Sequence, residues 1–317
     1  MKYSVRYAIS IGTPALDLLI QKPCLSIHSV FKKVINLSVN DDMIITISKP
    51  EQRNLPYGIL CDFQELDLRN IAEIGQKVLI NLDQQLILGG EFVIDFSRAV
   101  HWIPHFQKHI PERSFEGIHE RLEWYKKFAH NKSSGNGLTP LVFMINELFT
   151  DTPLNSSNQL IKKAEKGIKT VIKGFRNNDL KGIVNGGLEL IGLGPGLTPS
   201  GDDVLVSLLL CLFVTMQESG KCVAKDALGQ LAILSRNLTS SLSSFQYYVA
   251  AQGYLSERYI EVLDSILNSQ EEKVMIQKGT QMISYGETSG MEILLGLLLG
   301  ISLYLEFNQK NILNYTR

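Results

Sequence analysis

The sequence predicts an α+β protein in which a small β-rich domain, shaped like a barrel or a sandwich, precedes a mostly α-helical domain. Three observations support this prediction. Short runs rich in Val, Ile and Leu follow one another at close spacing up to about residue 100. From about residue 112, apolar residues recur at every third or fourth position, which is the period of a helix. A loop followed by an apolar helix then occurs twice, so the helical domain carries an internal loop-helix repeat.

We assign the β-rich domain to residues 1–105. Two turn sequences, at residues 40–42 and 83–84, separate neighbouring strands. A short helix is expected at residues 13–20, with Thr13 as its N-cap and Pro14 in its first turn. The clearest strands are expected at residues 43–48, 57–63, 76–82 and 90–96.

We assign the α-helical domain, which carries a glycine-rich motif, to residues 106–317. The small residues at 133–137 (SSGNG) are typical of a mobile loop. The apolar stretches at 204–214 and 293–305 are shorter than the roughly 20 residues of a membrane span, so we expect buried core helices and no membrane partner. Helices are expected at residues 115–129, 140–149, 158–173, 204–214 and 293–305.

Composition excludes several functional classes. The chain has 317 residues, of which 44% are hydrophobic, enough for a large buried core. Its formal net charge of -1 argues against nucleic acid as a partner, since binding a polyanion requires clustered excess cation. The four cysteines form no C-x-x-C pair, which disfavours a disulfide framework and a thiolate zinc site. We therefore expect a cytoplasmic protein.

The strongest functional signal is the glycine-rich segment at residues 186–201, GGLELIGLGPGLTPSG. It contains six of the 25 glycines of the chain, so its backbone adopts conformations that other residues resist or approaches another group closely. Its end aligns with residues 286–294 if Pro199 is a one-residue insertion. In the two copies Ser200 and Ser289 each precede an acid by three residues, as in a capping box.

The repeat predicts two helix N-termini that are built alike and face each other across a pseudo-twofold core. Free N–H groups at such ends, together with the helix dipole, bind anions. A hydroxyl-rich segment at 236–244 could grip the same small polar ligand. The same residues also fit a purely structural role, in which hydroxyls cap helices and glycines allow close packing. The expected substrate-binding residues are Gly192, Gly194, Gly196, Thr198, Ser200, Gly201, Arg236, Thr239, Ser243, Thr288, Ser289 and Gly290.

The charges of the motif limit how an anion is bound. Residues 182–220 and 279–309 contain no Lys, Arg or His, although both motif copies carry acids. A bound anion must therefore be neutralised by cations from elsewhere in the chain or by a metal ion. We assign the catalytic role to Asp202 and Asp203, which would bind Mg²⁺, if a metal is used, or accept hydrogen bonds from a substrate amide. On this hypothesis Asp202→Asn abolishes turnover with little change in melting temperature.

Residues 192–203, GLGPGLTPSGDD, resemble the signature of a protein family that includes the AllH-type subunit of oxamate carbamoyltransferase, an enzyme of anaerobic allantoin breakdown. The resemblance extends to SVFKKVINL at 29–37, DFSRAVHW at 95–102, TSSLS at 239–243, AAQG at 250–253 and TSG at 288–290. It implies a subunit of a multi-protein enzyme that moves a carbamoyl group between carbamoyl phosphate and oxamate.

The same resemblance implies the partners of the chain, which are a small anionic or carbamoylated substrate and the other subunits of the enzyme. The phosphate-binding motif of the usual carbamoyltransferases, S-T-R-T, does not occur in the sequence. The alternative is therefore a non-catalytic subunit that binds a metabolite or acts as a scaffold in a multi-protein complex.

Overall fold

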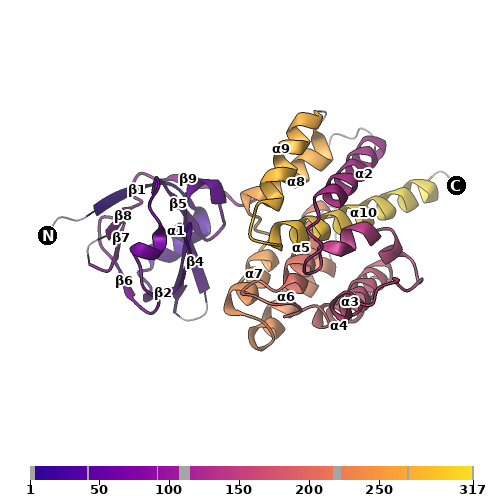
Figure 1. The fold of residues 1–317 in the computed structure, drawn as a ribbon, viewed down its shortest axis with the longest axis horizontal. Helices are drawn as coiled ribbons and strands as arrows, with labels where there is room; N and C mark the ends of the chain where they lie inside the picture. The colour runs from indigo at the N-terminus through magenta and orange to yellow at the C-terminus, as the bar shows by residue number, and fades with distance from the viewer. Residues whose placement is uncertain are drawn as a thin grey trace. The chain divides into compact units, whose positions relative to one another are not determined.

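A computed structural model describes residues 4–40, 43–90, 92–106, 115–216, 223–269 and 271–315 of the chain. The chain forms two compact units, one β-rich and one helical, and Figure 1 shows the strands and helices of each. The predicted α+β class is therefore confirmed. The first unit comprises Met1–His105 and Tyr254–Arg258, and the second comprises Phe106–Gly253 and Tyr259–Arg317. The return of the chain at Tyr254–Arg258 is not part of the boundary that we expected from the sequence.

Eight strands of the first unit close into a barrel in the order β5-β4-β3-β2-β6-β7-β8-β1, and β1 pairs again with β5. A ninth strand, β9, also pairs with β1. β8 pairs with Ser4–Tyr7 of β1, and β9 pairs with the following segment, Ser10–Gly12. The strands are β1 (Ser4–Gly12), β2 (Leu25–Val30), β3 (Val34–Val39), β4 (Met43–Ser48), β5 (Gly58–Cys61), β6 (Lys77–Ile80), β7 (Gln85–Leu88), β8 (Phe92–Asp95) and β9 (Val100–Trp102).

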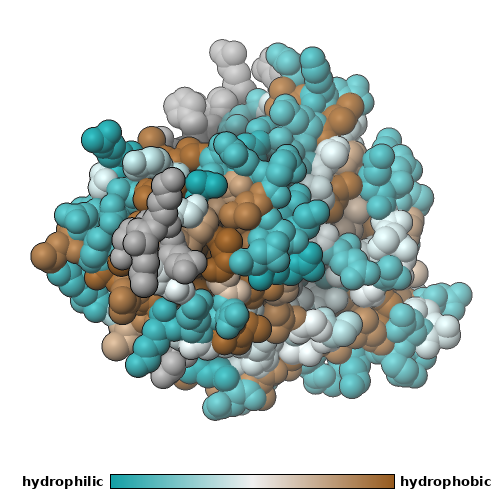
Figure 2. All heavy atoms as spheres, turned by 60° about the vertical axis from the view of Figure 1, so that its left-hand side comes forward, coloured by the Kyte–Doolittle hydropathy of each residue, from teal (hydrophilic) through white to brown (hydrophobic). Residues whose placement is uncertain are grey.

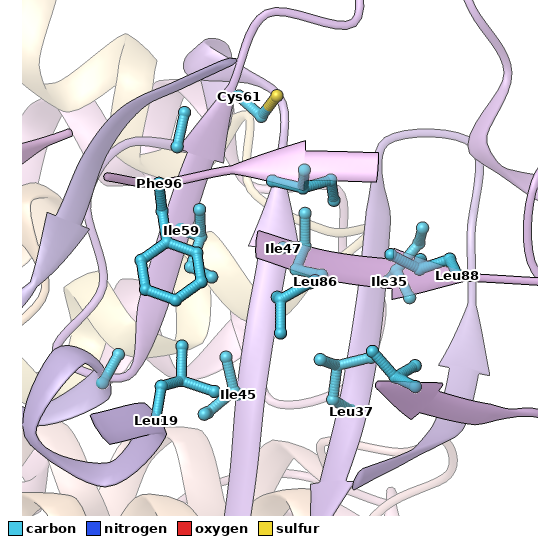
Figure 3. Packing of buried hydrophobic residues seen from close by; sticks show 14 of the residues in the cluster. Leu19, Ile35, Leu37, Ile45, Ile47, Ile59, Cys61, Leu86, Leu88 and Phe96 are labelled. Carbon is cyan, nitrogen blue, oxygen red and sulfur yellow. The ribbon is translucent and has the colours of Figure 1, made fainter. Parts of the chain in front are cut away.

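Alternate residues of these strands fill the barrel, as the two-residue period of a strand requires. In the antiparallel β3–β4 ladder, Ile35 lies opposite Ile47 and Leu37 lies opposite Ile45, and all four side chains are buried (Figure 3). Leu19 joins this core from α1 (Thr13–Ile20).

Some of the local predictions for this unit are confirmed and others are wrong. The strand at residues 43–48 is confirmed at both ends. Gln84 adopts a left-handed conformation between the antiparallel strands β6 and β7, as the predicted turn requires, whereas Asp41 and Asp42 of the other turn lie outside the described residues. The N-cap of α1 is Gly12, so the prediction of Thr13 was wrong. Thr13 is already helical, and no side chain caps this end.

The segment Tyr254–Arg258 is held to the β-rich unit by polar contacts. The Glu257 carboxylate accepts hydrogen bonds from the backbone and side-chain nitrogens of Asn54, at 2.8 and 2.9 Å. The Arg258 guanidinium donates to the Glu51 carbonyl at 2.7 Å. These long-range contacts explain why a short segment far along the chain belongs to the first unit.

The second unit is built from nine α-helices and three 3-10 helices among its described residues, and the helix that begins at Glu257 has its first two residues in the first unit. They are α2 (Phe115–Lys132), η3 (Thr139–Met144), η4 (Glu147–Phe149), α3 (Gln159–Arg176), α4 (Leu180–Leu188), α5 (Ser200–Thr215), α6 (Val223–Leu234), η6 (Ser235–Asn237), α7 (Ser241–Ala251), α8 (Glu257–Asn268), α9 (Glu272–Ile283) and α10 (Ser289–Tyr315). The predicted α-helix at 140–149 was wrong, because η3 and η4 occupy this segment. Apolar residues spaced three apart suit a 3-10 helix as well as an α-helix over so short a run.

Helices α5 and α10 form the centre of the helical unit. All residues of α5 are buried, which explains its continuous apolar sequence. Gly296 of α10 lies against Ser207 of α5, and Gly300 lies against Cys211, so closely that a Cβ on either glycine would collide with its neighbour. Both pairs have the same offset in the sequence, so the two helices run parallel and in register.

The length of α10 corrects one expectation. The window Ser289–Asn308 is long and apolar enough for a membrane span by length and composition, although the apolar stretch at 293–305 alone is too short. In the structure 83% of this window is buried inside the protein, as in a core helix. On the face seen in Figure 2, hydrophobic side chains lie in several groups among hydrophilic ones.

Candidate functional site

The two copies of the loop-helix motif meet in the helical unit. Thr198, at the end of the first loop, and Ser289, at the start of α10, place their hydroxyl oxygens 3.0 Å apart. The Gly201 N–H donates to the Leu193 carbonyl, and the Gly290 N–H donates to the Tyr285 carbonyl, both at 2.8 Å. The predicted repeat is therefore present in the backbone geometry as well as in the sequence.

The glycine in each copy is required by the same close approach. A Cβ on Gly201 would collide with the Leu190 carbonyl oxygen, and a Cβ on Gly290 would collide with the Met282 carbonyl oxygen. From Leu193 to Gly201 the first loop is three residues longer than the second, which runs from Tyr285 to Gly290. The extra residues of the first loop include positions before Gly196, outside the segment that we aligned.

The predicted capping boxes are wrong, because each helix begins one residue earlier than they require. The N-cap of α5 is Pro199, whose carbonyl accepts the N–H groups of Asp202 and Asp203 at 3.0 and 3.3 Å. At the start of α10, the Thr288 carbonyl accepts the N–H groups of Met291 and Glu292 at 3.0 and 3.1 Å.

Ser200 and Ser289 are instead the first residues of their helices. Four of the N–H groups that a helix leaves free at its start, those of Gly201, Asp202, Gly290 and Met291, are bonded inside the motif. The expected supply of free N–H donors for an anion is therefore largely consumed by the protein.

Asp202 is a buried carboxylate whose two oxygens are both occupied. Its Oδ1 accepts a hydrogen bond from the Tyr247 hydroxyl at 2.8 Å, and its Oδ2 accepts one from the Thr239 hydroxyl at 2.5 Å. The Gly192 N–H lies 3.2 and 3.3 Å from the two oxygens. Burial raises the pKa of Asp202, while the donors Thr239, Tyr247, Gly192 and Ser243 act in the opposite direction. Asp202 thus ties the glycine-rich loop to α7 and the segment before it.

Asp203 has a different environment, although it is the next residue. Its side chain is buried, and its Oδ2 has no hydrogen-bond partner among the residues that the structure describes. Burial raises the pKa of Asp203 well above its ordinary value; a hydrogen bond with Ser289 lowers it, and the negative charges of Glu292 and Asp202 raise it. Of the two acids, Asp203 therefore has an oxygen available to a ligand and Asp202 does not.

The loop at residues 133–138 packs over the joined helix starts. The Leu138 N–H donates to the Glu292 carboxylate at 2.9 Å, and the Thr288 hydroxyl donates to its other oxygen at 3.0 Å. Gly137 has a φ of +56° and lies so close to Glu292 and Ser200 that a Cβ would collide with the Glu292 side chain. The loop that we expected to be mobile thus forms part of this cluster.

Comparison with known proteins identifies the family of the chain. Residues 190–301 match the family model described as oxamate carbamoyltransferase subunit AllH, and residues 7–101 match the AllH family N-terminal domain. Together the two matches cover most of the chain.

The chain belongs to the AllH family.

The resemblance carried by residues 192–203 is thereby confirmed. No solved structure matches the chain. The AllH match includes both copies of the motif, from the turn before the glycine-rich loop to the central part of α10. The loop at residues 133–138 lies outside both matched segments of this AllH-family chain.

The other predicted site residues lie in distinct places around the motif. Gly194 packs against Ser200, whereas Gly196 is exposed at the tip of the loop with open space around its Cα. Ser243 approaches Asp202 from the first turn of α7 and Thr239 from the segment before it. Arg236 is exposed in η6, and no ion pair or hydrogen bond engages it among the described residues.

The residues do not fit the Mg²⁺ site that Asp202 and Asp203 would form if a metal were used. Among the described residues, no group of three or more His, Cys, Asp or Glu side chains is arranged to hold a metal ion. Asp202 directs both oxygens at hydrogen-bond donors, so it is not available as a cation ligand beside Asp203. We therefore derive no chemical step through a metal in this AllH-family protein.

Three members of the cluster were not among the expected site residues. Tyr247 contacts Asp202 from a helix far along the chain, and burial raises its pKa, so its hydroxyl stays protonated and can donate. Glu292 and Leu138 join the two helix starts to the 133–138 loop. The glycines of SSGNG were the only signal in the sequence that this loop approaches another group closely.

Proposed function

We propose that this chain is a subunit of an enzyme that transfers a carbamoyl group, and that it contributes a substrate site at the joined starts of α5 and α10. Membership of the AllH family supports the first part. One observation carries the second: Asp203 is a buried carboxyl group with one oxygen unpaired, next to Ser289 and Glu292. Buried polar atoms in folded proteins nearly always have partners, so an unpaired carboxyl oxygen indicates a ligand or a chemical role.

The chemistry of this cluster suits an amide that also carries an anionic group. Oxamate has a carboxamide and a carboxylate, and carbamoyl phosphate has a carbamoyl group, which also carries an N–H₂, and a phosphate. The unpaired Oδ2 of Asp203 accepts a hydrogen bond from the amide nitrogen, and the Thr198 hydroxyl donates to an anionic oxygen, because the Ser289 hydroxyl already bonds to Asp203. The Thr198 hydroxyl oxygen lies 3.0 Å from that of Ser289, which places Thr198 beside the same ligand position.

Carbamoyl transfer also requires that a proton be moved. The oxamate nitrogen forms a bond to the carbamoyl carbon, the bond from that carbon to the phosphate oxygen breaks, and the proton lost by the nitrogen ends on phosphate. A carboxyl group whose pKa is raised by burial is suited to accept this proton and release it again. We assign that role to Asp203, while Asp202 positions the glycine-rich loop.

Access to Asp203 requires movement of the surrounding loops. Asp203 and Glu292 are both buried, and the loops at 133–138 and 194–198 flank them. Gly135 and Gly137 have positive φ, and Gly194 and Gly196 do also, so both loops contain residues that tolerate a change of backbone conformation. Substrate binding in this proposal opens one of these loops.

A second function, binding of the same metabolite without catalysis, is favoured by the charges. Residues 182–220 and 279–309 contain no Lys, Arg or His, so this chain does not neutralise a phosphate within the motif. In that case the catalytic cations belong to another subunit, and Asp203 only holds the substrate amide.

The test uses the enzyme assembled from this chain and its other subunits, with phosphate release from carbamoyl phosphate and oxamate as the assay. We expect Asp203→Asn to lower kcat by about 100-fold or more, the usual effect of losing an acid–base group. The matched control is Asp226→Asn, an exposed aspartate of α6, which should leave kcat unchanged.

Measurements of ligand binding distinguish the catalytic function from binding without catalysis. Differential scanning fluorimetry of each variant with oxamate, and with carbamoyl phosphate, reports whether the ligand still stabilises the chain. Loss of the ligand-induced shift together with a large loss of kcat supports the catalytic site. Loss of the shift with a rise in KM alone supports the binding function. Wild-type kcat and KM in Asp203→Asn would refute both.

A further inference from the structure

Exposed aliphatic side chains surround the glycine-rich loop. Ile233 and Leu238 are 71% and 50% exposed, and the other members are between 39% and 45% exposed. We call this set the aliphatic face; its members are Leu188, Leu197, Ile233, Leu234 and Leu238. Clusters of exposed apolar residues of this kind mark interaction sites more often than single exposed residues do.

Contacts between their segments bring these residues together. Gly192 packs directly against the Leu238 carbonyl, and the Ser240 hydroxyl donates to the Leu197 carbonyl. Gly187, next to Leu188, packs against Leu231 of α6, one turn before Leu234. The glycine-rich loop, the end of α4 and the end of α6 with η6 are therefore neighbours in the fold.

The charges around the aliphatic face indicate what kind of partner covers it. Arg236 lies between Leu234 and Leu238, is exposed, and has no ion-pair partner among the described residues. Glu189, which follows Leu188 in the chain, is already paired, because its carboxylate is 2.7 Å from the Lys166 ammonium. The face thus offers the cation of Arg236 to a partner, while the adjacent glycine-rich loop lacks any cation for an anionic substrate.

A second copy of the chain is a poor match for this surface. In a twofold-symmetric dimer centred on it, each residue near the axis meets its own copy, so Arg236 would face Arg236. Such a dimer would also bring together two loops that both lack a cation. Like charges placed opposite each other in an interface oppose association.

We propose that the aliphatic face docks a different subunit of the same enzyme, with an apolar contact surface, an acidic residue opposite Arg236, and an Arg or Lys that reaches the glycine-rich loop. This inference rests on the proposed function, because the cation is needed only if the loop borders a site for an anionic substrate. It assigns the partner a defined place on this chain, beside the joined starts of α5 and α10.

The test measures binding of this chain to the other purified subunits of the enzyme by isothermal titration calorimetry. Ile233→Glu and Leu238→Glu each place a charge in the centre of the face, and we expect each to raise Kd roughly 30-fold or more, as loss of a hot spot does. The matched control is Ile276→Glu on α9, where the wild-type residue is 46% exposed. It should change Kd less than about threefold. Circular dichroism and melting temperature establish that each variant is folded.

Each outcome decides the proposal. Wild-type Kd in Ile233→Glu and Leu238→Glu overturns it, as does failure of the wild-type chain to bind the other subunits. If sedimentation shows a wild-type dimer that these substitutions dissociate, the face joins two copies instead. Arg236→Glu tests the charge argument by itself. It should weaken binding of the other subunit, and the loss should be smaller at high salt.

The failure of this inference is distinguishable from failure of the proposed function. The Asp203→Asn chain should bind the other subunits normally and fail only in turnover. If Asp203→Asn is fully active while Ile233→Glu does not assemble, the docking surface stands and the proposed site is wrong.

Discussion

Replacing Asp203 with asparagine should stabilise the helical unit, which is an unusual effect for a buried acid. The substitution keeps the shape of the side chain and removes its ability to ionise. Asn retains an oxygen for the hydrogen bond with Ser289 and puts an N–H₂ group where Oδ2 has no partner. The neighbouring Glu292 carboxylate, whose charge disfavours an ionised Asp203, attracts such a donor.

The magnitude follows from the environment of that oxygen. A buried polar group without a partner costs about 1–3 kcal/mol, and a nearby like charge adds to the cost. If Asn removes part of that cost, the free energy of unfolding rises by about 1–2 kcal/mol at pH 7. For a unit of this size each kcal/mol shifts the melting temperature by about 2–4 °C, so we expect a rise of about 2–8 °C.

The effect should depend on pH with a defined sign. Because the pKa of Asp203 is raised in the folded state, the folded protein keeps a proton that the unfolded chain releases near the ordinary value of 3.8. The stability of the wild-type protein therefore falls as pH rises from about 4 towards the raised pKa. Asp203→Asn lacks this dependence, so its advantage should be small near pH 4 and largest near pH 8.

The neighbouring substitution provides the contrast. Asp202→Asn puts an N–H₂ group among four hydrogen-bond donors, so we expect a loss of about 1–3 kcal/mol and a lower melting temperature. This differs from the expectation based on sequence alone, which was little change in melting temperature.

Scanning calorimetry of Asp203→Asn and Asp202→Asn from pH 4 to pH 8, with Asp226→Asn as the control, tests both predictions. If Asp203→Asn lowers the melting temperature as much as Asp202→Asn, then Asp203 is a structural residue and the reasoning is wrong.

Two further predictions concern the packing of the motif. Gly290→Ala should lower the free energy of unfolding by at least about 2 kcal/mol in urea denaturation, because the added Cβ collides with the Met282 carbonyl. The control is Gly229→Ala in α6, where the space is open, and it should be neutral or stabilising. Equal losses in the two variants would contradict the packing argument. Tyr247→Phe should cost about 1.5–3 kcal/mol by the same measurement, since it removes a donor to the buried Asp202 carboxylate. Tyr248→Phe, at a half-exposed position on the same helix, should cost little, and a similar loss there would show that the hydrogen bond is not the cause.

The fold class and the repeat could be predicted from the sequence because both depend on local patterns. The run MIITIS predicts β4 with the correct bounds, since its flanking turn residues and β-branched side chains are both typical of a strand. The first strand, β1, was not predicted. Tyr7 and Ile9 of this strand are exposed while Ala8 and Ile11 are buried, so apolar residues occur on both faces and hide the two-residue period.

The roles of Asp202 and Asp203 could not be separated in the sequence. Successive residues of a helix point about 100° apart, so adjacent acids face different neighbours. Asp202 faces Tyr247 and Thr239, whereas Asp203 faces the start of α10. These neighbours are far away in the chain. Only the packing of α5 against α7 and α10 determines which of the two carboxyl groups has both oxygens hydrogen-bonded.

The return of Tyr254–Arg258 to the barrel has a practical consequence for anyone who wishes to divide this protein. The polypeptide passes from one unit to the other three times, so no single cut yields both units whole. A fragment ending at His105 would leave Asn54 without the Glu257 carboxylate that receives its two N–H donors. Fragments made by truncation would therefore understate the stability of the β-rich unit, and a permuted or full-length chain is the better starting material.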